Sequence, residues 1–149
     1  MALDDDIRIL SRVTLFQGFT SEQLRLLAFG AEPVTLPAGR KLYVEDDEAD
    51  TAYVVVSGRI ELYREGGKGA LAAAGPGALL GEMALIADTQ RLTSAVAVED
   101  AEVLRLSRKM FHRILEEYPD VAEALRERIV ADIQALIAQI EAMANRFDD

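Results

Sequence analysis

A glycine–glutamate pair, a short apolar run and an arginine form the segment of this chain best suited to chemistry. Gly81 and Glu82 open the segment, and Arg91 follows Glu82 by nine positions (91 − 82). A loop of this composition can present backbone N–H groups, a carboxylate and a guanidinium fork to one small ligand. Together these groups suit a phosphate that is bonded to a sugar hydroxyl.

The composition leaves few alternatives to that segment. The 149 residues include no cysteine and one histidine, His112, so thiolate sites, disulfides and His-rich metal or acid–base centres are excluded. We therefore expect no catalytic residue, no metal and no cofactor. A net charge of −10 lacks the basic footprint that nucleic acids and anionic membranes attract, so neither is expected as a partner.

The patterns of apolar and turn residues divide the chain into three segments of a single domain. Residues 1–32 are predicted to be helical, and residues 33–107 to form seven or eight short strands separated by turns, with the Gly81–Arg91 segment late among them. Residues 108–149 are predicted to form two helices. With an acidic start, no signal peptide and no apolar run long enough to cross a membrane, the chain is expected in the cytoplasm.

The last helix is predicted to be long, beginning at Pro119, because apolar residues recur along it at steps of three and four. This stripe consists of Val121, Leu125, Ile129, Ile133, Leu136, Ile140 and Met143, and Ile137 widens it. Such a stripe packs either on the strands or on a second copy of itself. With the charges beside it, we expect a homodimer through this helix.

The order of these elements, from Leu15 to about Ala144, resembles the cyclic nucleotide-binding domain family, the type found in catabolite activator protein and the protein kinase A regulatory subunit. The phosphate-binding cassette of that family reads roughly Gly-Glu-(Leu/Met/Ile)-Ala-Leu, a spacer, then Arg-(Ser/Thr/Ala)-Ala. Here the cassette reads Gly81-Glu82-Met83-Ala84-Leu85-Ile86 and, after the spacer, Arg91-Leu92-Thr93-Ser94-Ala95-Val96. Leu15-Phe16-Gln17-Gly18 and Val54-Val55-Val56-Ser57-Gly58 also match.

The resemblance implies a mainly β fold with flanking helices. It predicts an antiparallel eight-stranded β-roll of the jelly-roll type, a double-stranded β-helix, with N-terminal helices and two C-terminal helices. It also implies a stand-alone regulatory receptor rather than an enzyme. The chain ends close to its last helix, which indicates either such a receptor or a fragment of a longer protein.

The resemblance assigns a role to each cassette residue. Arg91 would neutralise the cyclic phosphate, Gly81 would allow close backbone approach, and Glu82 would accept a hydrogen bond from the ribose 2′-hydroxyl. A short helix starting near Glu82 would supply further N–H donors, those of Met83 and Ala84. The complete set of expected ligand contacts is Gly81, Glu82, Met83, Ala84, Arg91, Leu92 and Thr93.

The ligand is expected to be cyclic AMP or cyclic GMP. Leu92 follows the arginine where cyclic GMP-selective relatives often carry threonine, which favours cyclic AMP slightly, unless Thr93 or Ser94 compensates. Gln90 stands where proline is frequent in the family. Ile133, Leu136 and Ile137 are candidates for a lid over the base, and movement of their helix would signal to an unidentified effector protein.

Three other interpretations remain open. Glu82 and Arg91 could form a structural ion pair. The chain could be a degenerate cyclic nucleotide-binding fold that acts in protein–protein assembly without a ligand, as Leu92 and the long apolar helix would allow. An enzyme on a similar barrel, such as a cupin-like isomerase or oxygenase, is disfavoured because it needs several histidine ligands.

Overall fold

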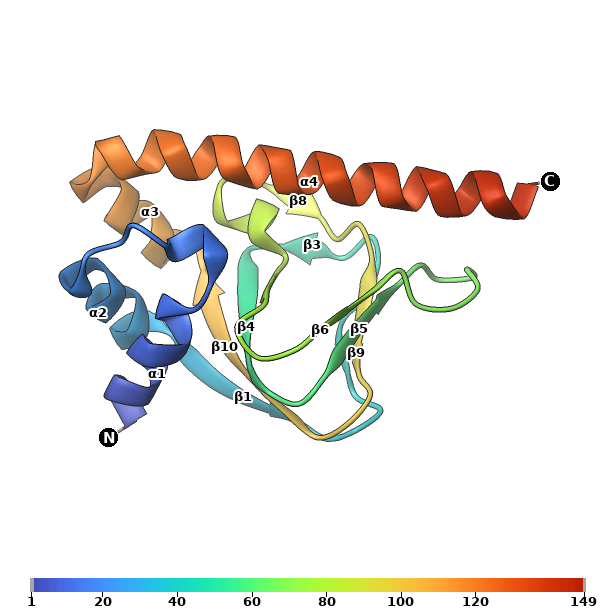
Figure 1. Cartoon of the computed structure of the whole chain (residues 1–149), viewed down its shortest axis with the longest axis horizontal. Coiled ribbons are helices and arrows are strands. Elements are labelled where there is room, and N and C mark those ends of the chain that lie inside the picture. Colours follow the sequence, from blue (N-terminus) through green and yellow to red (C-terminus); the bar gives the residue numbers. More distant parts are fainter. Residues whose placement is uncertain (1, 149) are drawn as a thin grey trace.

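A β-roll lies beside a cluster of short helices, and one long helix crosses both (Figure 1). The structure, a computed structural model, describes residues 2–148, and side chains from Leu3 to Ala142. The helices are α1 (Ala2–Ser11), the short 3₁₀ helix η1 (Thr14–Phe16), α2 (Ser21–Gly30), a second 3₁₀ helix η2 (Glu82–Leu85), α3 (Arg108–Glu117) and α4 (Pro119–Asp148). The strands are β1 (Glu32–Leu36), β2 (Lys41–Tyr43), β3 (Glu48–Ala49), β4 (Thr51–Ser57), β5 (Ile60–Tyr63), β6 (Ala72–Ala74), β7 (Leu79–Leu80), β8 (Thr89–Gln90), β9 (Ser94–Ala97) and β10 (Ala101–Ser107).

The described strands form two four-stranded antiparallel sheets and a two-stranded ribbon. One sheet has the order β1-β10-β4-β7, the other has the order β2-β9-β5-β6, and β3 pairs with β8. This arrangement confirms the predicted mainly β roll with flanking helices. The strand count reaches ten rather than eight because β3, β7 and β8 are separate two-residue strands.

The first sheet is buried on both faces, which explains the continuous apolar run in β4. Val54 and Val55 point to opposite faces, as successive strand residues must. Val54 packs with the core beneath the helices, whereas Val55 packs with the core between the two sheets. In the neighbouring β10, Leu104 packs with the core beneath the helices and Val103 packs with the core between the sheets. The roll is therefore held between the second sheet and the helices.

The predicted N-terminal helices are α1 and α2, with a break in the chain between them. The chain turns at η1 and at Gly18, whose φ of +100° suits glycine. Thr20 then caps α2, because its hydroxyl accepts a hydrogen bond from the Gln23 N–H while the Gln23 side chain accepts one from the Thr20 N–H. Pro33 lies in the edge strand β1, where a missing N–H is tolerated.

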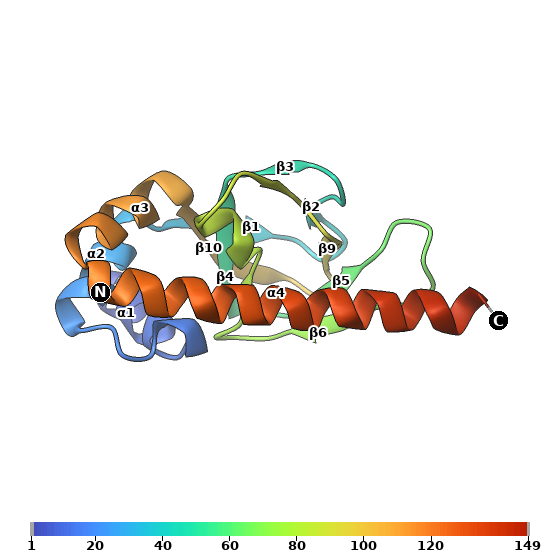
Figure 2. The same cartoon turned by 90° about the horizontal axis from the view of Figure 1, so that it is seen from above.

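Helix α4 begins at Pro119, as predicted, and packs on the domain through part of its apolar stripe. Leu125, Ile129 and Ile133 are buried. Two further contacts hold the helix: Arg128 donates to the Thr14 carbonyl (2.8 Å), and Gln139 donates to the Leu71 carbonyl (2.8 Å). The side chain of Met143 lies outside the described residues. Figure 2 shows α4 running over the roll and beyond β6. None of the described helices combines the length and apolarity needed to cross a bilayer.

Candidate functional site

The cassette opens at a backbone position that requires glycine. Gly81, at the N-terminal end of η2, has φ +72°, the left-handed region that side chains disfavour. A Cβ atom built there would lie 2.3 Å from Nη1 of Arg91 and 3.5 Å from the Thr51 carbonyl oxygen. The absence of a side chain therefore allows the guanidinium to approach the backbone of the cassette directly.

Arg91 is buried, with 7% of its surface exposed. Its Nη2 donates to the Thr51 hydroxyl (3.1 Å), and that hydroxyl donates to the Tyr53 hydroxyl (3.2 Å). The guanidinium carbon lies 4.3 Å from the centre of the Tyr43 ring and 5.7 Å from that of Tyr53. Two aromatic faces thus support the cation, which forms no ion pair with a described side chain.

Burial dominates the electrostatics at the arginine. It lowers the pKa of the Arg91 guanidinium, while Tyr43, Tyr53, Asp50 and Asp47 act in the opposite direction. Burial also raises the pKa of the Tyr43 hydroxyl to about 12, although Arg91 and Thr93 oppose that shift. Tyr43 is consequently neutral at ordinary pH and serves as an uncharged wall beside the cation.

The backbone of Arg91 is fixed by the ribbon of β3 and β8. Its N–H donates to the Asp47 carbonyl (2.8 Å), and its carbonyl accepts from the Asp46 N–H (2.9 Å). Asp46 has φ +73°, the one positive value that the described non-glycine residues show. This bend brings the acidic loop against the arginine strand.

Helix η2 confirms the short helix predicted near Glu82, but it changes the expected set of free donors. The Ala84 N–H already donates to the Gly81 carbonyl (3.1 Å), closing the first turn. The first N–H groups of a helix have no partner within it. In η2 those belong to Glu82 and Met83, so Ala84 does not supply the donor that the sequence suggested.

Glu82 does not pair with Arg91. Among residues whose side chains are described, no ion pair joins the two, which removes the structural ion-pair interpretation. Burial, together with the charge and the hydrogen bond of Asp132 on α4, raises the pKa of the Glu82 carboxyl to about 8. The carboxyl thus faces α4 rather than the guanidinium.

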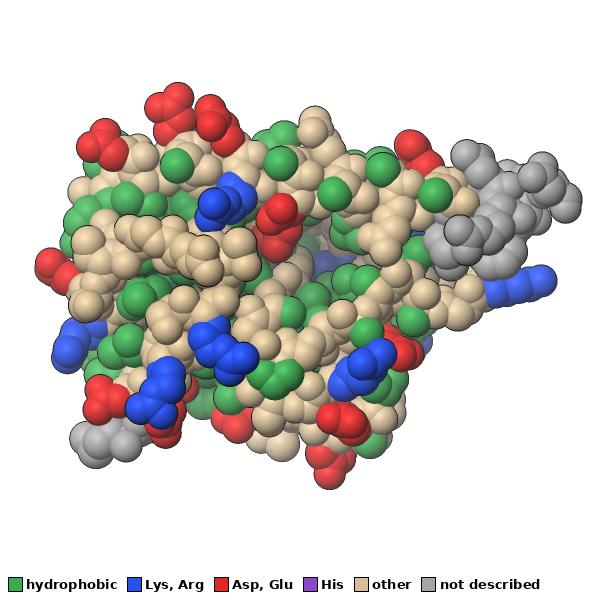
Figure 3. All heavy atoms as spheres, viewed as in Figure 1, with side chains coloured by type: hydrophobic (Ala, Val, Ile, Leu, Met, Phe, Trp, Pro, Cys, Tyr) green, Lys and Arg blue, Asp and Glu red, His purple; other side chains and the backbone are tan. Residues whose placement is uncertain are grey.

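These groups surround a cavity of about 200 Å³ between the roll and α4. Figure 3 shows the surface hollowed beneath α4, with charged side chains of both signs scattered around it. Every predicted ligand-contact residue lines this cavity: Gly81, Glu82, Met83, Ala84, Arg91, Leu92 and Thr93. The residues of the predicted cassette therefore lie together in one place.

Two of the three lid candidates line the cavity. Ile133 and Leu136 line the cavity, whereas Ile137 does not and is 39% exposed. Successive helix residues are rotated by about 100° around the axis, so the residue after Leu136 faces away from the roll. This placement does not support a lid role for Ile137.

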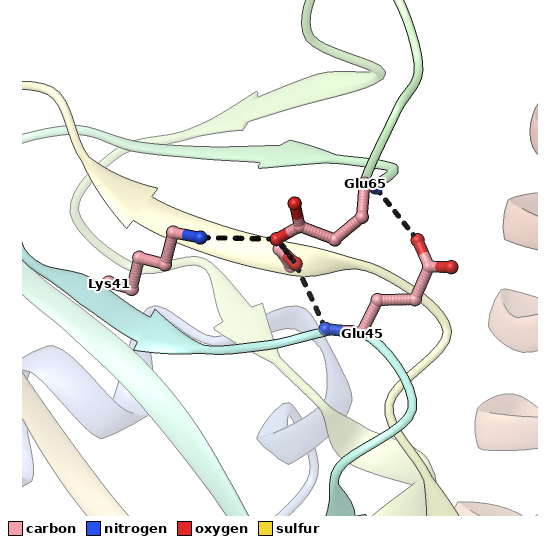
Figure 4. Close-up of polar contacts among 4 residues, drawn as sticks. Lys41, Glu45 and Glu65 are labelled. Carbon is pink, nitrogen blue, oxygen red and sulfur yellow. Dashed lines mark hydrogen bonds and ion pairs between the residues drawn. The ribbon is translucent and has the colours of Figure 1, made fainter.

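A polar network holds the strand that follows the cassette (Figure 4). The Ser94 hydroxyl donates to the Glu65 carboxylate (2.8 Å) and accepts from the Glu45 N–H (2.9 Å). Lys41 donates to the same Glu65 oxygen (3.2 Å), and the Glu65 N–H donates to the Glu45 carboxylate (3.0 Å). These bonds anchor Ser94 in β9, three positions after Arg91 (94 − 91).

Several residues at the site carried no signal in the sequence. Tyr43, Thr51 and Tyr53 belong to strands whose alternation predicted only sheet structure, and Asp132 lies inside the stripe that predicted an apolar lid. In the described part of the chain, no group of His, Cys, Asp or Glu side chains is arranged to hold a metal ion.

Comparison with known proteins identifies the family of this chain. The family model of the cyclic nucleotide-binding domain matches residues 33–118. The chain is 33% identical to the cyclic AMP receptor protein of Thermus thermophilus over 140 residues, which is 89% of this chain and 65% of the receptor. This chain belongs to the cyclic nucleotide-binding domain family.

Solved structures give the same fold. A cyclic nucleotide-binding-like protein from Brucella abortus is 58% identical, with a TM-score of 0.68 over 76% of this chain and 99% of that one. The catabolite activator protein of Thermus thermophilus is 32% identical, with a TM-score of 0.72 over 87% of this chain and 62% of that one.

The chain spans less than two thirds of the length of the curated relatives described here. It covers 7% of a Chaetomium globosum lysophospholipase, at 29% identity over 73% of this chain. Its match to that enzyme is thus confined to a small part of the enzyme's length.

Proposed function

We propose that this chain is a regulatory receptor for a cyclic nucleotide, with cyclic AMP favoured over cyclic GMP. The observation that carries the proposal is the buried Arg91 guanidinium at the wall of a cavity that also contains the Glu82 carboxyl. A cyclic nucleotide has one phosphate charge beside a ribose hydroxyl. A guanidinium fork pairs with the first, and an ionised carboxylate accepts from the second.

The preference for cyclic AMP is supported by the hydroxyl groups near the arginine. Leu92 has none, and the Thr93 hydroxyl is hydrogen-bonded to Tyr43. The Ser94 hydroxyl both donates to Glu65 and accepts from Glu45. Neither Thr93 nor Ser94 therefore offers a free hydroxyl in place of the one that Leu92 lacks. A guanine base that needs a hydroxyl there gains no advantage.

A relay through α4 is supported by the size of the cavity. A volume of about 200 Å³ is small beside the roughly 300–1,000 Å³ of typical small-molecule pockets. A nucleotide that enters must therefore displace Ile133, Leu136 or Asp132, all on α4. Since a ligand shifts a conformational equilibrium only through contacts that differ between the states, these residues would couple binding to helix position.

A homodimer through α4 also belongs to the proposal. Val130 is 42% exposed and Ile137 is 39% exposed, and seven positions separate them (137 − 130), which is the repeat of a coiled-coil seam. A second copy of α4 would cover both side chains. An effector protein in the cytoplasm would read the resulting change in α4.

Isothermal titration calorimetry with cyclic AMP and cyclic GMP tests the proposal. Arg91→Ala should abolish binding of both nucleotides, and the wild-type protein should bind cyclic AMP more tightly. Arg59→Ala is the matched control, since it removes the same charge from a side chain that is 55% exposed. Wild-type protein that binds neither nucleotide would favour the assembly module, and equal binding by Arg91→Ala would refute the phosphate role.

A further inference from the structure

An acidic residue of the last helix faces the cassette glutamate. Asp132 lies on α4 immediately before the buried Ile133, and it lines the same cavity as Glu82. The two carboxyls are hydrogen-bonded to each other. They come from positions fifty apart in the chain (132 − 82) and meet because α4 packs on η2.

Two hydrogen-bonded carboxyls need one proton between them, since an ionised carboxylate has no hydrogen to donate. Two ionised carboxylates in contact would repel each other instead. The pKa of Glu82, raised to about 8, is consistent with a proton held at neutral pH. At neutral pH the two carboxyls are therefore held together by this proton.

Among the side chains that the structure describes, no ion pair joins a cation to Glu82 in place of that proton. Arg91 is directed to Thr51 and to the faces of Tyr43 and Tyr53. Tyr43 in the cavity wall also interacts with Glu82. Asp47 and Asp50 act on Arg91, and Arg108 of α3 pairs with Asp88.

We propose that Asp132 is a positioning residue for Glu82: the two carboxyls share one proton that holds α4 against the cassette, and the hydroxyl of a bound ligand replaces Asp132. The inference rests on the proposed function. Before binding, Glu82 and Asp132 together hold one proton. After binding, Glu82 is ionised and accepts from the ligand hydroxyl, Asp132 turns away from Glu82, and the proton leaves to the buffer.

This exchange makes binding depend on pH in a defined direction. The free protein holds one more proton than the complex, so affinity must rise with pH while the pair is protonated and level off above its titration. A single released proton gives up to about a tenfold gain in affinity per pH unit. At neutral pH, the heat of binding should vary with the ionisation enthalpy of the buffer by close to one proton per ligand.

Asp132→Asn separates this role from simple packing. The amide donates an N–H to an ionised Glu82 and needs no proton. We expect the variant to bind cyclic AMP with a nearly flat pH profile and without proton release. Glu141→Gln is the matched control, because it removes the same charge from an exposed position on the same helix, and it should keep the wild-type profile.

The test combines calorimetry in buffers of different ionisation enthalpy, from pH 6 to 9, with an NMR titration of the Glu82 carboxyl carbon in the ligand-free protein. The inference predicts a raised Glu82 titration midpoint that falls in Asp132→Asn. If cyclic AMP binds wild type and Asp132→Asn with the same pH profile, the exchange is refuted while the proposed function stands. If no nucleotide binds, the exchange and the proposed function both fail. An ordinary Glu82 midpoint would refute the proton-sharing pair by itself.

Discussion

Replacing Gly81 with alanine tests whether the cassette depends on close contact between its backbone and the buried arginine. The left-handed conformation of Gly81, with φ +72°, costs alanine about 1 kcal/mol relative to glycine. The added Cβ would also lie 2.3 Å from Nη1 of Arg91, closer than real Cβ atoms come to a neighbour. The guanidinium must therefore move.

Moving the guanidinium weakens the contacts that hold it. Its hydrogen bond to Thr51 and its position on the Tyr43 ring, at 3.1 Å and 4.3 Å, together contribute about 2 kcal/mol or more. We expect Gly81→Ala to lower the free energy of unfolding by about 3 kcal/mol in all. Displacing two charged N–H···O bonds to a phosphate, at about 1.5 kcal/mol each, should weaken cyclic AMP binding about a hundredfold.

Gly66 offers a matched control for the backbone penalty. Its φ is +76°, and an added Cβ would meet nothing within 4 Å. Gly66→Ala should therefore lose only about 1 kcal/mol of stability and bind cyclic AMP as wild type does. Urea denaturation followed by circular dichroism gives the stabilities, and calorimetry gives the affinities. Equal losses of stability in the two variants, or wild-type affinity in Gly81→Ala, would refute the argument.

Two further substitutions probe the surroundings of the arginine. Asp46→Gly removes the strain of a left-handed residue at φ +73°, so its free energy of unfolding should rise by up to about 1 kcal/mol in thermal denaturation. A lower melting temperature would mean instead that the aspartate side chain stabilises the loop. Tyr43→Leu removes the ring 4.3 Å from the Arg91 guanidinium and should lower the free energy of unfolding by about 2 kcal/mol. Tyr53→Leu removes a ring at 5.7 Å and should lower it less. The reverse order in urea denaturation would contradict the assigned contacts.

The order of elements and the cassette could be predicted from the sequence because both depend on interactions between residues close together in the chain. Thr20 and Gln23 form a capping box, a local motif that requires only suitable residues three positions apart. Pro119 begins α4 because its fixed φ and missing N–H suit the first turn. Gly81, Glu82 and Arg91 come together because they belong to one short loop.

Contacts between distant segments were decided only by the tertiary structure. The aromatic faces around Arg91 come from β2 and β4, and the alternation of those strands predicts a sheet without saying which side chains meet. The hydrogen bond that uses the Ala84 N–H depends on where the turn of η2 closes. The sequence could not determine which lid candidates reach the cavity, because the rotation of α4 about its axis is set by its packing. That same rotation turns Leu136 toward the cavity and Ile137 away from it. It also brings the Asp132 carboxyl to Glu82, whose pKa is raised by burial and by the contact with Asp132.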